Sequence, residues 1–290
     1  MTEEKQKKVR KKSRKTLTAL NEGMASNELA SDISEILAGE RPLSQSEARL
    51  LVDMYYQIQG NRVATNNRVK AAQKNEEPTS TLEWFMDGFL FLEYQIKKVL
   101  EIYVDSDING RWLKSHRGIG PVISAGLLAH IDINKAKTAG AIWRFAGLDP
   151  TSVWKKKTKR PWNGSLKRLC WILGESFVKF SPSLYNTLYK ERKALEIQRN
   201  ESGLNTEEAR RCLPNFDKST DAYQAYVKDK LPDGRIHLRA QRWAVKIFLA
   251  HYHEQLWRET FGTMPPNPYV LEHKGHVHKI ETEIPFTTAV

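Results

Sequence analysis

A short run between two predicted helical segments carries the residues best suited to hold a phosphate group. Residues 113–131 read Leu-Lys-Ser-His-Arg-Gly-Ile-Gly-Pro-Val-Ile-Ser-Ala-Gly-Leu-Leu-Ala-His-Ile. Gly118 and Gly120 allow backbone angles closed to other residues and bring main-chain N–H groups against an anion. Pro121 suits the first position of a helix, whose N-terminal end favours negative charge. The run therefore matches a helix-hairpin-helix pattern.

The residues expected to contact DNA in this turn are Arg117, Gly118, Ile119 and Gly120, with Ile119 also anchoring the turn in the core. Contacts to phosphates carry no base information, so such a site recognises shape and charge. We therefore expect binding that is largely independent of sequence. A plain helical turn that uses two glycines is the alternative.

A second candidate surface follows in residues 151–168, where tryptophans alternate with basic residues. Five of the eight tryptophans lie in or near this surface in the sequence, at positions 112, 143, 154, 162 and 171. Aromatic faces beside Lys and Arg suit stacking on bases or sugars together with phosphate neutralisation. The expected DNA contacts are Lys155, Lys156, Lys157, Lys159, Arg160, Lys167 and Arg168. A solvated loop over buried tryptophans is the alternative.

The positive charge of the chain is concentrated in two places. The net charge is +12 over 290 residues. Residues 1–16 carry eight Lys or Arg against two Glu, and residues 111–170 carry thirteen against two Asp. A concentrated basic patch attracts polyanions, whereas a dispersed one does not. DNA is therefore the expected partner, and structured or guide RNA is the alternative.

Composition narrows the class of protein further. Hydrophobic residues make up 40% of the chain, enough for a packed core, and the mean hydropathy is -0.58. Cys170 and Cys212 are too few for a disulfide framework and form no Cys-x-x-Cys pair. No apolar run reaches the length of a membrane helix. The sequence predicts a cytoplasmic, nucleoid-associated protein without a cofactor and without membrane contact.

Histidine clusters near the C-terminus raise the question of a metal site. They comprise His251, His253, His273, His276 and His278. Structural zinc sites combine such histidines with cysteines or acids at fixed spacings, and only Glu272 adjoins the second cluster. No metal is therefore predicted, and a polar or DNA-facing tail is favoured.

The elements that must position these residues are mainly α-helical. Residues 1–42 are predicted to form a basic flexible arm, because they contain few large apolar groups. Residues 43–105 are predicted to form an antiparallel helical hairpin, with a capping box at Ser44 and Glu47 and a turn at 74–78. The apolar stripe of its second helix comprises Leu82, Phe85, Phe89, Leu92, Ile96 and Leu100. An intramolecular core is favoured for this stripe over packing in a homo-oligomer.

Residues 106–262 are predicted to form the helical domain that carries the glycine turn, and residues 263–290 an extended, proline-containing tail. Helical spacing is expected at 111–116, 121–131, 138–146, 164–180, 182–198 and 239–258. The stretches 148–163 and 200–235 are predicted to be loops.

The order of these motifs resembles the C-terminal helical domain of the DEDD insertion-sequence transposase and site-specific invertase family. In that family a Gly-Ile-Gly-Pro hairpin precedes an Ala-Gly-Leu-x-Pro motif, a basic loop with a serine, and a Gly-x-x-x-Leu-Arg-like helix start. Here these are Gly118 to Pro121, Ala146 to Pro150, Ser152 with the lysine run, and Gly164 to Arg168. The resemblance covers about residues 110–180.

The resemblance implies a DNA transposase or recombinase of a mobile element, with Ser152 as the candidate nucleophile toward a phosphodiester and Ser165 as its substitute. The family's RuvC-like N-terminal domain needs an early strand ending in aspartate, and the first hundred residues offer none. Its serine is usually followed by glycine, whereas Val153 follows Ser152. A non-catalytic, accessory nucleic-acid-binding module is therefore the alternative function.

Overall fold

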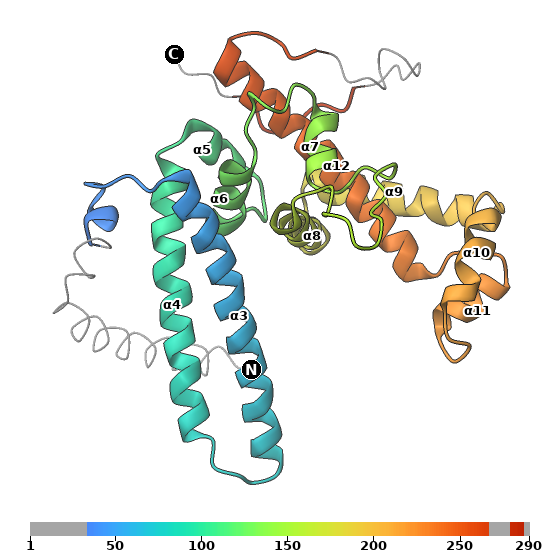
Figure 1. The fold of residues 1–290 in the computed structure, drawn as a ribbon, viewed down its shortest axis with the longest axis horizontal. Coiled ribbons are helices and arrows are strands. Elements are labelled where there is room, and N and C mark those ends of the chain that lie inside the picture. The colour runs from blue at the N-terminus through green and yellow to red at the C-terminus, as the bar shows by residue number, and fades with distance from the viewer. Residues whose placement is uncertain (1–33, 267–278, 287–290) are drawn as a thin grey trace. The chain divides into compact units, whose positions relative to one another are not determined.

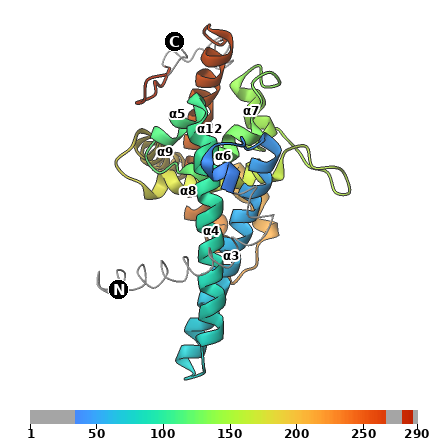
Figure 2. The same cartoon turned by 90° about the vertical axis from the view of Figure 1, so that its left-hand side faces the viewer.

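The computed structural model describes residues 34–266 and 279–286. Every regular element in these ranges is a helix, so the predicted mainly α fold class is confirmed (Figures 1 and 2). None of the described helices is long and apolar enough to cross a membrane. The basic run of residues 1–16, the histidines at 273, 276 and 278, and most of the predicted tail lie outside the described residues.

The chain folds as two compact units. The first contains the described residues up to Arg111 together with Gly120–His130, and the second contains Trp112–Ile119 and the described residues from Ile131 onward. The short helix α5 (Ile108–Ser115) carries the chain from the first unit into the second.

The first unit is a long helical hairpin with a third, shorter helix. Helices α3 (Gln45–Lys74) and α4 (Ser80–Asp105) run antiparallel, and α6 (Pro121–His130) packs against both (Figure 1). The tip of the hairpin lies at residues 75–79, where a turn was expected.

The predicted capping box at the start of α3 is confirmed. The amide of Glu47 donates to Oγ of Ser44 over 3.2 Å, and the amide of Ser44 donates to the Glu47 carboxylate over 2.9 Å. Hydrogen bonds from Ser44 and Arg41 lower the pKa of Glu47 to about 2. Because the carboxylate is ionised and bonded at neutral pH, the helix start is firmly set.

The apolar stripe of α4 follows the expectation only in its C-terminal half. Ile96 and Leu100 are buried, but Phe85 and Leu92 are 51% and 39% exposed. α6 has 10 residues and α4 has 26, so the third helix cannot cover the whole hairpin. The expected burial of Phe85 and Leu92 was therefore wrong.

The second unit is organised around one long helix, α12 (Asp233–Phe261). It packs against α7 (Ala139–Phe145), α8 (Gly164–Lys179) and α9 (Leu184–Glu201) (Figure 1). All four correspond to predicted helices, but α12 starts six residues earlier than expected, directly after its N-cap residue Pro232.

The prediction of a loop throughout residues 200–235 was wrong. Two seven-residue helices, α10 (Thr206–Cys212) and α11 (Asp221–Val227), flank the short 3-10 helix η1 (Leu213–Asn215). They enclose a small core of Ala209, Tyr226, Leu231 and Ile236. Elements of two turns contain too few apolar positions to show a helical period, which is why the sequence pattern missed them.

A buried tryptophan ties the C-terminal part of the chain to this unit. Trp112 stacks on Phe248, Tyr252 and Phe286, with ring centroids 6.1 to 6.2 Å apart. Its indole N–H donates to the carbonyl of Pro285 over 3.2 Å. Residues 279–286 are non-helical, but they are held against the core.

Buried histidines occupy the same core. Nδ1 of His116 lies 2.9 Å from the carbonyl oxygen of Trp112, and its Nε2 has no hydrogen-bond partner among the described residues. Burial lowers the pKa of His116 to about 4. Burial also lowers the pKa values of His251 and His253, whose rings bond to main-chain carbonyls. All three are neutral in the folded protein at pH 7.

The stability of the protein is therefore expected to fall on acidification. Between pH 6.5 and 4 the unfolded chain binds a proton at His116 that the folded chain excludes, which costs up to about 3 kcal/mol. His116→Gln should reduce the pH slope of the unfolding free energy by about 1.2 kcal/mol per pH unit near pH 5.5. Urea titrations from pH 5 to 7 measure this slope, and an unchanged slope contradicts the burial of a neutral ring.

Candidate nucleic-acid interface

The glycine turn between α5 and α6 is closed by main-chain hydrogen bonds. The amide of His116 donates to the carbonyl of Leu113 over 3.2 Å, and that of Ile119 donates to the carbonyl of His116 over 3.0 Å. Ile119 is 4% exposed and Pro121 is the first residue of α6, as the sequence predicted. Arg117 is exposed at the tip of the turn.

Gly118 occupies a position that only glycine fits without strain. Its φ is +89°, and a Cβ there would lie 2.7 Å from Oγ of Ser176 and 2.8 Å from Cδ2 of Phe180. The Ser176 hydroxyl donates a hydrogen bond to the Gly118 carbonyl. The turn is thereby fixed to the C-terminal part of α8.

Gly120 is a different case. Its φ is not positive, and a Cβ there would meet nothing within 4 Å, so the expectation that Gly120 needs special backbone angles was wrong. The absence of a side chain at Gly120 leaves open space beside the backbone. The amides of Gly118 and Gly120 donate to no acceptor within the described part of the chain. Two N–H groups are therefore available to an external anion.

The basic segment, residues 151–163, is the loop that leads into α8, and specific contacts hold it at both ends. Gly147 has φ +66°, and the indole of Trp162 lies flat against it, where a Cβ would be 2.7 Å from Cγ of the indole. The amide of Asn163 donates to the carbonyl of Phe145 over 2.9 Å. The Asn163 side chain then caps α8 by accepting from the amide of Leu166 over 2.8 Å.

Two of the predicted cations lie on two of the predicted tryptophans. The Arg160 guanidinium is 5.0 Å from the ring centroid of Trp154, and Nζ of Lys167 is 4.1 Å from that of Trp162. The two indoles meet edge to face at 6.3 Å. Burial, followed by the charges of Arg242 and Arg160, lowers the pKa of Lys167. Positive charge and aromatic surface are therefore concentrated together.

The remaining predicted cations of the segment face solvent. Lys155, Lys156, Lys157 and Lys159 are exposed, as is Arg168 in the first turns of α8. Lys157 has φ +66°, and the carbonyl of Lys155 accepts bonds from Thr158 that close the turn around it. The lysines are thus displayed by a defined turn.

The turn and the basic segment lie at opposite ends of α8. Gly118 contacts Ser176, whereas the basic segment leads into Gly164, twelve residues earlier in the same helix. At 1.5 Å per residue this separation is about 18 Å along the helix axis. The structure therefore brings Arg160 and Lys167 together but keeps Gly118 apart from them.

Ser152 lies half-buried at the start of the basic segment. Its amide donates to the carbonyl of Asp149 over 3.2 Å. The Asp149 carboxylate accepts from the amide and hydroxyl of Thr151 and from Arg144. These bonds, those from Thr151 foremost, lower the pKa of Asp149. Asp149 is therefore a structural anchor and a poor proton acceptor. Ser165 lies in the first turn of α8.

A row of basic residues on α12 was not predicted. Arg235, Arg239, Arg242 and Lys246 follow one another at spacings of four, three and four, which places them on one face of the helix. That spacing was the signal available in the sequence. Burial lowers the pKa values of Arg242 and Lys246.

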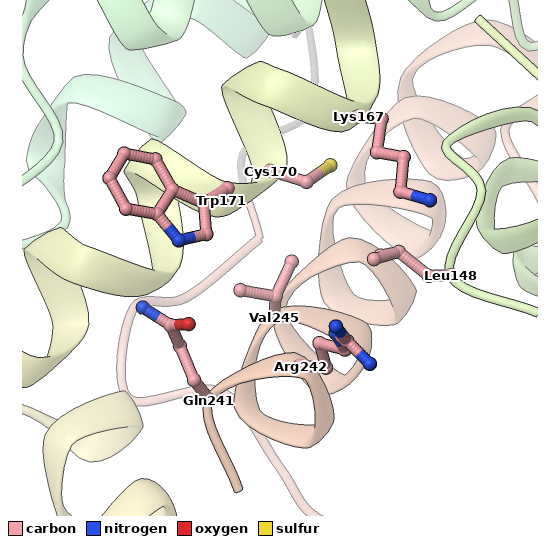
Figure 3. A pocket seen from close by; sticks show the side chains of 7 residues that line it. All are labelled: Leu148, Lys167, Cys170, Trp171, Gln241, Arg242 and Val245. Carbon is pink, nitrogen blue, oxygen red and sulfur yellow. The ribbon is translucent and has the colours of Figure 1, made fainter. Parts of the chain in front are cut away.

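Arg242 and Lys167 share a small cavity between α8 and α12, of about 80 Å³ (Figure 3). Its lining comprises Leu148, Lys167, Cys170, Trp171, Gln241, Arg242 and Val245. Figure 3 shows the Lys167 amine and the Arg242 guanidinium at one end, beside Leu148, with Trp171 and Gln241 at the other. Burial raises the pKa of the Cys170 thiol to about 12, so the thiol is protonated and unreactive.

Metal-ligating side chains are not clustered in this part of the molecule. Across residues 34–266 and 279–286, no group of three or more His, Cys, Asp or Glu side chains could hold a metal ion.

The fold and the site together define a mainly helical protein with a basic, tryptophan-bearing surface. Residues 110–163 match the family described as Transposase IS116/IS110/IS902 family. The match includes the glycine turn and the basic segment up to the N-cap of α8, and it supports a transposase-family domain there. Among curated proteins and among solved structures, nothing matches the chain.

The two glycines of the turn should respond differently to the same substitution. Gly118→Ala forces a side chain into a positive φ and against Ser176 and Phe180, and should destabilise the fold by about 1–3 kcal/mol. Gly120→Ala should change stability by no more than about 0.5 kcal/mol. Chemical denaturation of both variants tests this, and a larger loss for Gly120→Ala contradicts the described turn.

Proposed function

We propose that the chain is a DNA-binding protein of the transposase or recombinase type, acting in transposition or site-specific recombination. The observation that carries the proposal is the stacking of Arg160 on Trp154 and of Lys167 on Trp162 within and beside the region that matches the transposase family. Stacked cations are held in place, so they lose little freedom when they meet a phosphate.

The lysine turn supplies the neutralising charge. Four exposed lysines and Arg160 release counterions from the phosphate backbone on binding, which makes the affinity strongly salt-dependent. The free amides of Gly118 and Gly120 add a second phosphate contact. The separation of about 18 Å along α8 corresponds to roughly five base pairs of one DNA strand. One duplex can then bridge both elements.

Strand chemistry at Ser152 is the finer part of the proposal and comes from the family resemblance. The serine hydroxyl attacks a DNA phosphodiester and loses its proton, a phosphorus–oxygen bond to the serine forms, and the bond to the sugar oxygen breaks. One proton is released at the serine and one is taken up by the leaving sugar oxygen, so the step is neutral overall. Lys155, Lys156 or Arg160 would stabilise the charge on phosphorus.

An accessory role without chemistry is the second candidate, and one observation favours it. Asp149, the carboxylate nearest to Ser152 in the sequence, is occupied by Thr151 and Arg144 and is a weak base. In this alternative the protein recognises junctions or structured RNA, and a partner supplies the strand chemistry. Self-association through the α3–α4 hairpin is compatible with both functions.

Removing two lysines should weaken DNA binding in a salt-dependent way. For Lys155→Gln combined with Lys156→Gln, we expect the slope of log affinity against log salt to decrease by nearly 2, since each phosphate contact contributes about 0.9. Fluorescence anisotropy with a labelled duplex at several salt concentrations measures the slope.

The matched control is Lys70→Gln with Lys97→Gln, two exposed lysines of α3 and α4. This variant should bind like the wild type. Equal losses in the two double variants would mean that net charge alone drives binding, and the proposed surface would be wrong.

Covalent chemistry is tested on denaturing gels after incubation with supercoiled and branched DNA. If Ser152 acts, the wild-type protein forms a DNA adduct that Ser152→Ala cannot form, while its duplex affinity stays unchanged. Ser165→Ala should keep the adduct. A wild-type protein that binds DNA and forms no adduct supports the accessory role.

A further inference from the structure

A second, larger cavity lies beside the basic segment. It has a volume of about 590 Å³ and lies between Pro150 and helices α10, α11 and α12. Its walls include Arg211, Phe216, Tyr226, Arg235, Arg239 and Arg242. The volume is within the range of pockets that hold small ligands. Pro150, which lines the cavity, precedes the candidate nucleophile Ser152 by two residues in the sequence.

The charge of this cavity is not balanced. Among the described residues that line it, Glu208 is the acid, and it is engaged by Nε of Arg235 at 2.8 Å and by Arg239 at 3.2 Å. Arg211 and Arg242 have no carboxylate partner in the described part of the chain. Two guanidinium groups therefore remain for an external anion.

Arg242 joins this cavity to the smaller one in Figure 3, where it lies at the same end as Lys167. Burial, followed by the charge of Arg235, lowers the pKa of Arg242, and Arg242 in turn lowers that of Lys167. Cations that repel one another in a partly buried site are stabilised by a bound anion. A bound phosphate group would therefore stabilise this arrangement of cations.

An aromatic ring stands in the same cavity. Phe216 is 39% exposed and packs on the buried ring of Tyr226, with centroids 4.9 Å apart. A ring supported from one side offers its free surface for stacking. Bases stack on such rings with little sequence preference, because every base has a π-face.

We propose that this cavity binds one unpaired nucleotide of a nucleic-acid strand, with its phosphate held by Arg211 and Arg242 and its base against Phe216. The inference rests on the proposed function, because a strand bound by the basic segment would enter the cavity beside Pro150, which lines it. A duplex held by the lysine turn needs no contact with this cavity.

The test compares labelled single strands of DNA and of RNA, each about twelve nucleotides long, with a labelled duplex. We expect Arg211→Gln, Arg242→Gln and Phe216→Leu each to lose at least about fivefold in affinity for the preferred single strand. The two arginine variants should also lower the salt slope by about 0.7. For Arg211→Gln and Phe216→Leu, which lie outside the proposed duplex surface, duplex affinity should remain within about twofold. Lys228→Gln, an exposed lysine outside the lining, is the matched control.

Three outcomes overturn the proposal: wild-type protein that binds no single strand, single-strand binding that none of the three variants weakens, or a Lys228→Gln loss as large as theirs. Thermal melts identify any variant that fails to fold. If Arg242→Gln or Phe216→Leu fails, the affinity of Arg211→Gln decides the test, because Arg211 is exposed and its substitution leaves the core intact. A wild-type protein that does not bind the duplex is a separate result, and it contradicts the proposed function itself. The preference between the two single strands identifies DNA or RNA as the source of the nucleotide.

Discussion

The contact between Gly118 and α8 is the constraint on which the proposed interface depends. A positive φ of +89° turns the chain so that the Gly118 carbonyl meets the Ser176 hydroxyl, with the Phe180 ring against the glycine. The same helix begins at the Asn163 cap that ends the basic segment. This helix therefore fixes Gly118 and the basic segment within one unit, and their spacing follows from its length.

The cations of the second unit have two kinds of partner, carboxylates and aromatic rings. Arginines of α9 and α12 pair with Glu196 of α9 and Glu208 of α10. In the basic segment, the stacked cations lie on indole rings. A carboxylate would neutralise the charge, whereas an aromatic face orients it and leaves it available. The segment can therefore attract a polyanion while remaining ordered.

Local signals in the sequence were enough to predict most of the helices. The capping box at Ser44, the proline that begins α6 and the apolar spacing of α8 each determine one element through contacts between near neighbours. The cation and tryptophan pairs also lie close in sequence, so Arg160 and Lys167 could be named from the sequence as candidate DNA contacts beside tryptophans.

Features that depend on distant residues could not be predicted in this way. Burial of the α4 stripe depends on the length of α6, and the need for glycine at 118 depends on Phe180. The large cavity forms only when α10 and α11 close over α12, and two-turn helices leave no periodic signal. Arg242 shows a helical spacing with Arg235 and Arg239, but only the fold shows that it joins two cavities.

Hydrogen–deuterium exchange with and without a DNA duplex tests the central claim most directly, because it reports every segment of the folded chain at once. We expect DNA to slow exchange in residues 150–168 and in the turn at 117–120, and to leave exchange in the α3–α4 hairpin unchanged. Protection confined to the hairpin, with none in residues 150–168, would contradict it.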